Sequence, residues 1–387
     1  MHFIPLNCKV MKNIMLTLFL LTAVPLLAQI KMDEIPSKSL NATRKLRILT
    51  PPSFGQDKNK KYPLLLVLDG EYLVDPFAGN LEYGYYWDEM PETIIVGVEM
   101  NGDDEQRMND VRTSEEGLPE GSGDNFFQFI GDELLPYLDK KYPISPFRII
   151  AGHDMTARMA NFFMYKENPP FRGYISFSPD MAMEMENRIP EMLSKVKAPT
   201  FFYLCSAEGD IKRLRDNIKT LNDNLKTVKN ANLTYMYDEF TGGSHYSVIP
   251  MGVPAALYGI YNSYKPISPI EYQEKIVTLP SGYVEYLIKK YEIIEKDLGT
   301  KMTIRLNDFK AIEAAILKNA VYDELKDLSK LAKANYPKTI IGEYYDGLFY
   351  EMTGDYKKAK KVYLNAYAYD SVGEYTKEFI VEKSEKM

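Results

Sequence analysis

Short apolar runs recur along the first two thirds of the chain and predict buried strands. Their apolar residues are nearly continuous rather than alternating, which is typical of strands covered on both faces. The clearest runs are Leu64–Leu68, Thr93–Val98, Arg148–Ala151, Gly173–Phe177 and Thr200–Cys205. Leu46–Leu49 is predicted as an early antiparallel edge strand, because Pro51 and Pro52 follow it closely.

Stretches with helical periodicity lie between these runs. The strongest are Asn125–Leu138, Thr156–Lys166 and Asp210–Val228. Alternation of strands and helices predicts a mostly parallel sheet flanked by helices.

The pattern changes after Tyr264, where prolines punctuate the chain and only helical periodicity follows. We therefore expect a domain boundary near residue 269. One helix is expected at Tyr283–Leu298, closed by Gly299.

Further along this tail, small and aromatic residues follow the spacing of a tetratricopeptide repeat. They are Gly347, Tyr350, Gly354, Tyr356, Ala359, Tyr363 and Ala366, with a weaker copy upstream at Ile316, Ala320, Tyr322, Leu325 and Ala332. Such repeats often present a concave surface to a peptide or protein, but a short array can also serve only to cap the body. Both interpretations stay open.

The N-terminus has the pattern of a secretory signal. A start at Met11, the apolar run Ile14–Leu27 and a small residue at Ala28 predict a signal peptide over residues 1–28. We expect an exported protein, periplasmic or extracellular, whose mature part has no transmembrane span. Cys8 would be removed with the signal, and Cys205 is expected to be a buried small residue.

Charge and composition narrow the function. The formal net charge is −7 and no long basic run occurs, so nucleic acid is excluded as an expected partner. Paired cysteine or histidine clusters and nucleotide-type glycine loops are missing from the sequence. No metal or cofactor is therefore expected.

The run Arg148–Arg158 reads as a strand, a sharp turn and a helix start, the place where an α/β-hydrolase holds its nucleophile. Other ordered motifs accompany it: Tyr62–Pro63, Leu68–Gly70, Ile95–Val98, Arg107 with Asp110, Gly121–Phe126, Glu133–Tyr137 and Ser178–Pro179. Together they resemble the esterase family of α/β-hydrolases that includes enterochelin esterases, the esterase D group and feruloyl esterases. The resemblance implies an α/β-hydrolase domain over residues 30–268, followed by the all-α tetratricopeptide-like domain over 269–387.

The turn departs from the family pattern at two positions. Asp154 stands where the family has its serine, and Thr156 stands where it has a second glycine. A β-branched Thr156 is expected to crowd the crossing of strand and helix. Asp154 tolerates a positive φ better than most residues.

The resemblance also places the other members of the site. His245 is similar to the catalytic histidine, whereas His153 lies inside the turn in a structural role. Either Glu208 or Asp210 would be the acid. The backbone N–H of Met155 and one at Gly70 or Glu71 would form the oxyanion hole.

These residues support two hypotheses. A carboxylate that attacks an ester forms an anhydride, whose carboxylate leaves more readily than the alkoxide. The first hypothesis is therefore a pseudoenzyme, or a protein that binds a small ester, aryl or sugar ligand and an envelope partner through the tail. In the alternative, the turn is similar to that of epoxide hydrolases and dehalogenases, with Asp154 as nucleophile and His245 as base on an ester, epoxide or halide.

Two other groups are assigned weaker roles. The aromatic residues of Tyr83–Trp87 could line a ligand pocket or stabilise a leaving group, or they could pack a helix on the sheet. Arg107 and Asp110 resemble a family pair of structural character, and neither is assigned a catalytic role.

Overall fold

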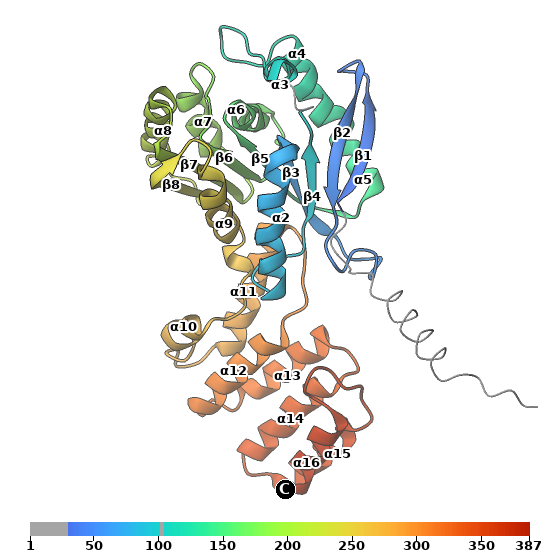
Figure 1. Ribbon diagram of the computed structural model, residues 1–387. Coiled ribbons are helices and arrows are strands. Elements are labelled where there is room, and N and C mark those ends of the chain that lie inside the picture. The colour runs from blue at the N-terminus through green and yellow to red at the C-terminus, as the bar shows by residue number, and fades with distance from the viewer. Residues whose placement is uncertain (1–29, 101–103) are drawn as a thin grey trace, which may run out of the picture.

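The structure is a computed structural model and describes residues 30–100 and 104–387. Eight strands form one sheet in the order β1-β2-β4-β3-β5-β6-β7-β8 (Figure 1). Their bounds are β1 Lys31–Ser37, β2 Ala42–Leu49, β3 Tyr62–Leu68, β4 Ile94–Val98, β5 Ile144–His153, β6 Gly173–Phe177, β7 Thr200–Gly209 and β8 Leu233–Ser244. All strands from β3 to β8 pair in parallel, and β1 and β2 are antiparallel.

The predicted strands all occur, with one difference at the edge of the sheet. Leu46–Leu49 belongs to β2, but β1 pairs along its outer side, so β2 is not the edge strand. The sequence of β1 is exposed at most positions and carries little apolar signal. The predicted signal peptide and Cys8 lie outside the described residues.

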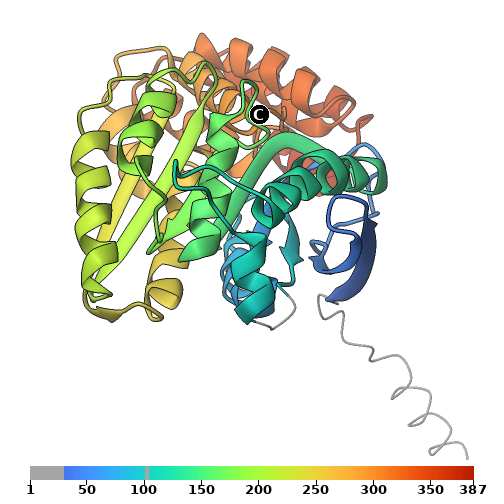
Figure 2. The ribbon, with the colours of Figure 1, turned by 90° about the horizontal axis from the view of Figure 1, so that it is seen from above.

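Helices cover both faces of the sheet (Figures 1 and 2). One face carries α2 Gly70–Tyr86 and α9 Val248–Ile260, and the other carries α4 Ser122–Gln128, η1 Phe129–Leu134, α5 Leu135–Lys141, α6 Met155–Phe162, η2 Phe163–Tyr165, α7 Met185–Ser194 and α8 Lys212–Leu225. A short helix, α3 Asp104–Asp110, follows β4, and η3 Asn262–Tyr264 follows α9. This arrangement is the α/β-hydrolase fold that the sequence predicts.

The C-terminal region is helical, as expected. Its helices are α10 Pro269–Glu271, η4 Tyr272–Ile276, α11 Tyr283–Leu298, α12 Leu306–Lys318, α13 Glu324–Asn335, α14 Ile340–Met352, α15 Tyr356–Ala366 and α16 Lys377–Glu385. The apolar core under α2 and α9 continues into these helices without a break. Gly299 at the end of α11 lies against Pro146 near the start of β5, so the tail covers the amino ends of the strands. The described helices include none that is both long and apolar enough to cross a bilayer.

Gly347 lets α14 and α15 approach closely. A Cβ at Gly347 would lie 2.2 Å from the buried ring of Tyr363. We expect Gly347→Ala to destabilise the protein by about 1–3 kcal/mol, because the tightly packed ring has to move. Gly79→Ala is the control. Gly79 is an exposed position of α2 where a Cβ would meet nothing within 4 Å, so this substitution should stabilise the protein slightly. Urea unfolding of both variants checks this, and equal behaviour would contradict the close contact.

Candidate active site

Asp154 lies in a sharp turn between β5 and α6, at the carboxyl end of the sheet. Its backbone angles are φ 58° and ψ −122°, a strained conformation for a residue with a side chain. The turn is fixed by the Asp154 N–H, which donates to the carbonyl of Phe177 (3.0 Å), and by the Asp154 carbonyl, which accepts from Asp180 (3.1 Å). The turn therefore has the geometry expected of a nucleophile elbow, with a carboxylate at its tip.

Thr156 does not crowd this turn in the way the sequence suggests. The tight approach is between backbones, since a Cβ on Gly152 would lie 2.5 Å from the carbonyl carbon of Thr156. The Thr156 hydroxyl is buried, donates to Asp69 (2.7 Å) and accepts from the His153 N–H (3.0 Å). The two hydrogen bonds of the Thr156 hydroxyl thus hold the turn at the position where the family has a glycine.

His245 and Asp210 form a close pair beside the elbow. The His245 Nδ1 lies 2.8 Å from Asp210 Oδ1, and the Ser178 hydroxyl donates to the other oxygen at 2.5 Å. Glu208 instead points outward and accepts from the Gly242 N–H. Of the two candidate acids, Asp210 is therefore the one that contacts His245.

The hydrogen bond that His245 donates to Asp210, reinforced by the charge of Asp210, raises the pKa of His245 against the opposing effect of burial, and the Asp154 charge acts in the same direction. Burial disfavours the charged form of Asp210, but the bonds from His245 and Ser178 outweigh it and lower its pKa. The pair therefore holds a proton on His245 more readily than a free imidazole does.

His153 behaves differently, although its ring centroid lies 4.5 Å from that of His245. Its Nε2 meets the His245 carbonyl (3.0 Å) and its Nδ1 meets the Tyr72 hydroxyl (3.1 Å). Burial, with the nearby charge of His245, lowers the pKa of His153 to about 4. A neutral ring fixed at both nitrogens agrees with the structural role expected for His153.

We expect the two imidazoles to titrate far apart in NMR spectra, His153 near pH 4 and His245 above its ordinary 6.5. The lowered pKa of His153 means that its contribution to stability is present above pH 6.5 and is lost as the pH falls toward 4. The raised pKa of His245 has the opposite sign: its contribution is present below pH 6.5 and is lost as the pH rises through the folded value. Asp210→Asn should return the pKa of His245 toward 6.5, and a His245 value below 6.5 in the native protein would contradict the pairing.

Arg107, on α3, is a site residue that the sequence analysis missed. Its guanidinium makes two bonds to Asp69 (2.7 and 2.9 Å), and its Nη1 lies 3.5 Å from Asp154 Oδ2. Asp69 is buried at the end of β3 and also accepts from the hydroxyls of Tyr72 and Thr156. Arg107 is therefore held in place by Asp69 and presents its remaining charge to Asp154.

Arg107 and Asp110 are not a pair, contrary to the family-based interpretation. Asp110 is bound to buried Arg44 (2.7 and 3.1 Å), a structural contact beneath α3. The sequence did hold a signal for the role of Arg107. It follows the parallel strand that ends at Val98, and ligands in open α/β sheets bind beyond the carboxyl ends of strands.

The expected oxyanion donors lie around the same turn. Met155 is the first residue of α6 and Gly70 is the first residue of α2. The first N–H groups of a helix have no partner within the helix and project beyond its N-terminal end. Arg47 donates to the carbonyls of Gly70 and Glu71 (3.3 and 3.0 Å), which fixes that turn.

The aromatic stretch Tyr83–Trp87 lies elsewhere. It ends α2, a helix of 17 residues and therefore about 25 Å long, whose first turn is at the site. Tyr83, Tyr86 and Trp87 are exposed, and the next residue, Asp88, pairs with Arg305 of the tail. Tyr83, Tyr86 and Trp87 therefore do not line the site, because the helix carries them to the amino ends of the strands. Tyr85 does pack against the sheet, as the other expectation has it, and its hydroxyl bonds to the backbone of Thr93 just before β4.

Cys205 is buried in β7, as expected. Among residues 30–100 and 104–387, no three His, Cys, Asp or Glu side chains are placed to hold a metal ion together.

Comparisons with known proteins agree with this geometry. The family model described as "Putative esterase" matches residues 37–196. An uncharacterised protein from Capnocytophaga ochracea has a solved structure that is 30% identical, covers 92% of this chain and 99% of its own, and superposes with a TM-score of 0.83. That match extends over both the body and the helical tail.

Two further relatives come from Bacillus. Ferri-bacillibactin esterase BesA from Bacillus subtilis is 25% identical over 147 residues, 35% of this chain and 51% of BesA, so the chain spans about half the length of this curated relative. The BES protein from Bacillus cereus is 23% identical over 60% of this chain and 94% of its own, with a TM-score of 0.52, and supports the fold alone. The chain therefore belongs to the esterase family of α/β-hydrolases.

Proposed function

We propose that this protein is an exported esterase-fold binding protein whose site holds an ester or aryl ligand without serine-type hydrolysis. One observation carries the proposal: a carboxylate, Asp154, occupies the elbow within 3.5 Å of Arg107, while His245 and Asp210 keep their pairing. The site thus retains the binding and orienting groups of an esterase but offers a poor nucleophile for an ester.

Charge explains why Asp154 should bind rather than attack. An acyl group transferred to Asp154 would form an anhydride, and the displaced alkoxide would be the poorer leaving group, so the step runs uphill. The neighbouring Arg107 stabilises the Asp154 carboxylate and so further lowers its tendency to attack an ester. A ligand hydroxyl can instead donate to Asp154, and a ligand carbonyl can accept from His245 in its protonated form.

The relatives suggest a ligand class. BesA is named as an esterase of ferri-bacillibactin, and the ester carbonyls of such a ligand could accept from the donor described above. The helical tail covers the amino ends of the strands, away from Asp154. We propose that it leaves the Asp154 site accessible and can contact an envelope partner. Export rests on the signal-like residues 1–28.

The retained His245–Asp210 pair favours a second candidate function, a hydrolase with Asp154 as nucleophile. Aspartate attack on a saturated carbon gives an alkyl ester, which an activated water can hydrolyse. This candidate requires His245 in its neutral form, whereas Asp210 raises the pKa of His245 and favours the charged form. The Asp154 carboxylate also lies 3.5 Å from Arg107, whose charge weakens it as a nucleophile, so the geometry supports binding better.

The test is an assay of the purified protein with short-chain aryl esters, ferri-bacillibactin, an epoxide and a haloacid, together with calorimetric binding of the same compounds. We expect binding of ferri-bacillibactin or an aryl ester and no turnover of any compound. Turnover that disappears in both Asp154→Asn and His245→Ala would overturn the proposal and establish the second candidate. Failure to bind any ester or aryl compound would reject the ligand class.

A further inference from the structure

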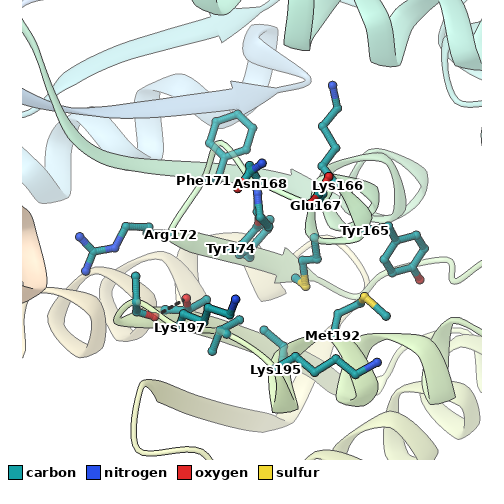
Figure 3. Close-up of a pocket in the computed structure, with 16 residues that line it drawn as sticks. Tyr165, Lys166, Glu167, Asn168, Phe171, Arg172, Tyr174, Met192, Lys195 and Lys197 are labelled. Carbon is teal, nitrogen blue, oxygen red and sulfur yellow. Dashed lines mark hydrogen bonds between the residues drawn. The ribbon is translucent and has the colours of Figure 1, made fainter.

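A cavity lies at the amino ends of the parallel strands, on the opposite side of the sheet's strand ends from Asp154. It has a volume of about 510 Å³ and opens at the amino ends of β6 and β7, between η2 and the end of α7 (Figure 3). Asp154 is at the carboxyl end of β5, so the two sites face opposite directions and share no residue. A volume of this size is in the range of small-molecule sites.

The inner wall of this cavity is apolar. Phe171, Tyr174 and Leu193 are buried, and the flexible side chains of Met164 and Met192 complete the wall. Thioethers adapt to irregular ligands better than branched side chains do. The wall therefore favours an aromatic or alkyl body.

Two buried hydroxyls in the lining have no hydrogen-bond partner within the described chain. They belong to Tyr165 and Tyr174, and the Tyr174 side chain is only 1% exposed. Burial raises the pKa of both phenols, so each keeps its proton and is a donor at neutral pH. Because an unpaired buried hydroxyl is costly, a bound acceptor oxygen at this place would remove a penalty.

The charge at the mouth is positive. Lys197 lies along one side of the cavity, and Lys195 lies at its rim near Met192 with its side chain directed away from the centre, as are those of Lys166 and Arg172 (Figure 3). Lys197 has no ion-pair partner among the described residues, and Lys195 has only an exposed pair with Glu191, which is worth little. These two lysines are available to an anionic ligand.

We propose that this cavity binds a small organic anion, a carboxylate or sulfonate attached to an aromatic or alkyl body. The body lies against Phe171 and Met192, and the acid group accepts from the tyrosine hydroxyls and faces Lys195 and Lys197. This anion site is independent of the function proposed for Asp154, because it lies at the amino ends of the strands and Asp154 lies at a carboxyl end.

The test uses two fluorescent probes with similar aromatic bodies, anionic 8-anilinonaphthalene-1-sulfonate and neutral N-phenyl-1-naphthylamine. We expect the native chain to bind one sulfonate probe. The double variant Lys195→Glu/Lys197→Glu should raise the Kd of the sulfonate about tenfold, the factor expected for loss of a charge-assisted contact, and change that of the neutral probe much less. Lys360→Glu/Lys361→Glu, two exposed lysines on α15, is the control with the same change in net charge.

Two further variants locate the probe. Met192→Trp fills the cavity and should abolish binding of both probes, and Tyr174→Phe keeps the ring but should weaken only the sulfonate. Thermal unfolding checks that each variant is folded. If Met192→Trp does not fold, the lysine double variant still tests the proposal. Equal losses in both lysine double variants, or a Kd that responds to Asp154→Ala and not to Tyr174→Phe, would overturn the proposal.

Discussion

Asp154→Ser should hydrolyse aryl esters at a rate on the order of 10³-fold above that of the native protein. The backbone at residue 154 already has the elbow conformation, and hydrogen bonds to Phe177 and from Asp180 hold it independently of the side chain. Serine therefore enters a preformed turn. Its hydroxyl would face His245, which Asp210 orients at 2.8 Å.

Arg107 should not prevent this gain. Asp69 holds the guanidinium through two short bonds, so removal of the Asp154 carboxylate leaves Arg107 in place rather than free to fill the site. Loss of the Asp154 charge also removes one of the influences that raise the pKa of His245, which makes the neutral base more available.

The measurement is initial-rate hydrolysis of p-nitrophenyl acetate and butyrate by the native protein, Asp154→Ser, Asp154→Ala and Asp154→Ser/His245→Ala. Activity should appear only in the single serine variant and should disappear when His245 is also replaced. A serine variant that is folded, keeps a His245 pKa raised by Asp210 and remains inert would mean that the site has lost more than its nucleophile.

The fold was predictable because its strands are buried on both faces. Runs such as Leu64–Leu68 carry a nearly continuous apolar signal, whereas β1 is mostly exposed and has none, so the sequence analysis missed it. The two candidate acids lie only two residues apart after the same strand, and sequence spacing cannot show that Glu208 points outward while Asp210 meets His245.

Contacts between distant segments explain the remaining differences. Arg107 finds its partner 38 residues away in Asp69, and Asp110 finds its partner 66 residues away in Arg44. The resemblance to a family pair suggested that both have the same structural role, but α3 presents Arg107 to the site and Asp110 to the core. The helical spacing of Tyr83–Trp87 likewise could not show that α2 runs from the site to the opposite edge.

Arg44→Met should destabilise the protein by about 3–5 kcal/mol, because it leaves Asp110 as an uncompensated buried charge. Both side chains are 2% exposed, and the guanidinium also lies 5.2 Å from the centroid of the Phe126 ring. Burial already raises the pKa of Asp110 despite its bonds from Arg44 and Gln106. Without Arg44, the pKa of Asp110 should rise further, so the loss of stability should become smaller as the pH falls and the buried carboxyl takes up a proton.

Arg148→Met is the matched control, because Arg148 also makes two bonds to one carboxylate, that of Asp139, but at the surface. Its loss should cost less than about 1 kcal/mol in urea unfolding. The double variant Arg44→Met/Asp110→Leu should recover most of the stability, since apolar side chains replace a buried pair well. Failure of the double variant to recover, with no pH dependence in Arg44→Met, would mean that shape rather than charge makes Arg44 necessary. Because Asp110 ends α3, the same pair sets the position of Arg107, so Arg44→Met should also weaken ligand binding at Asp154.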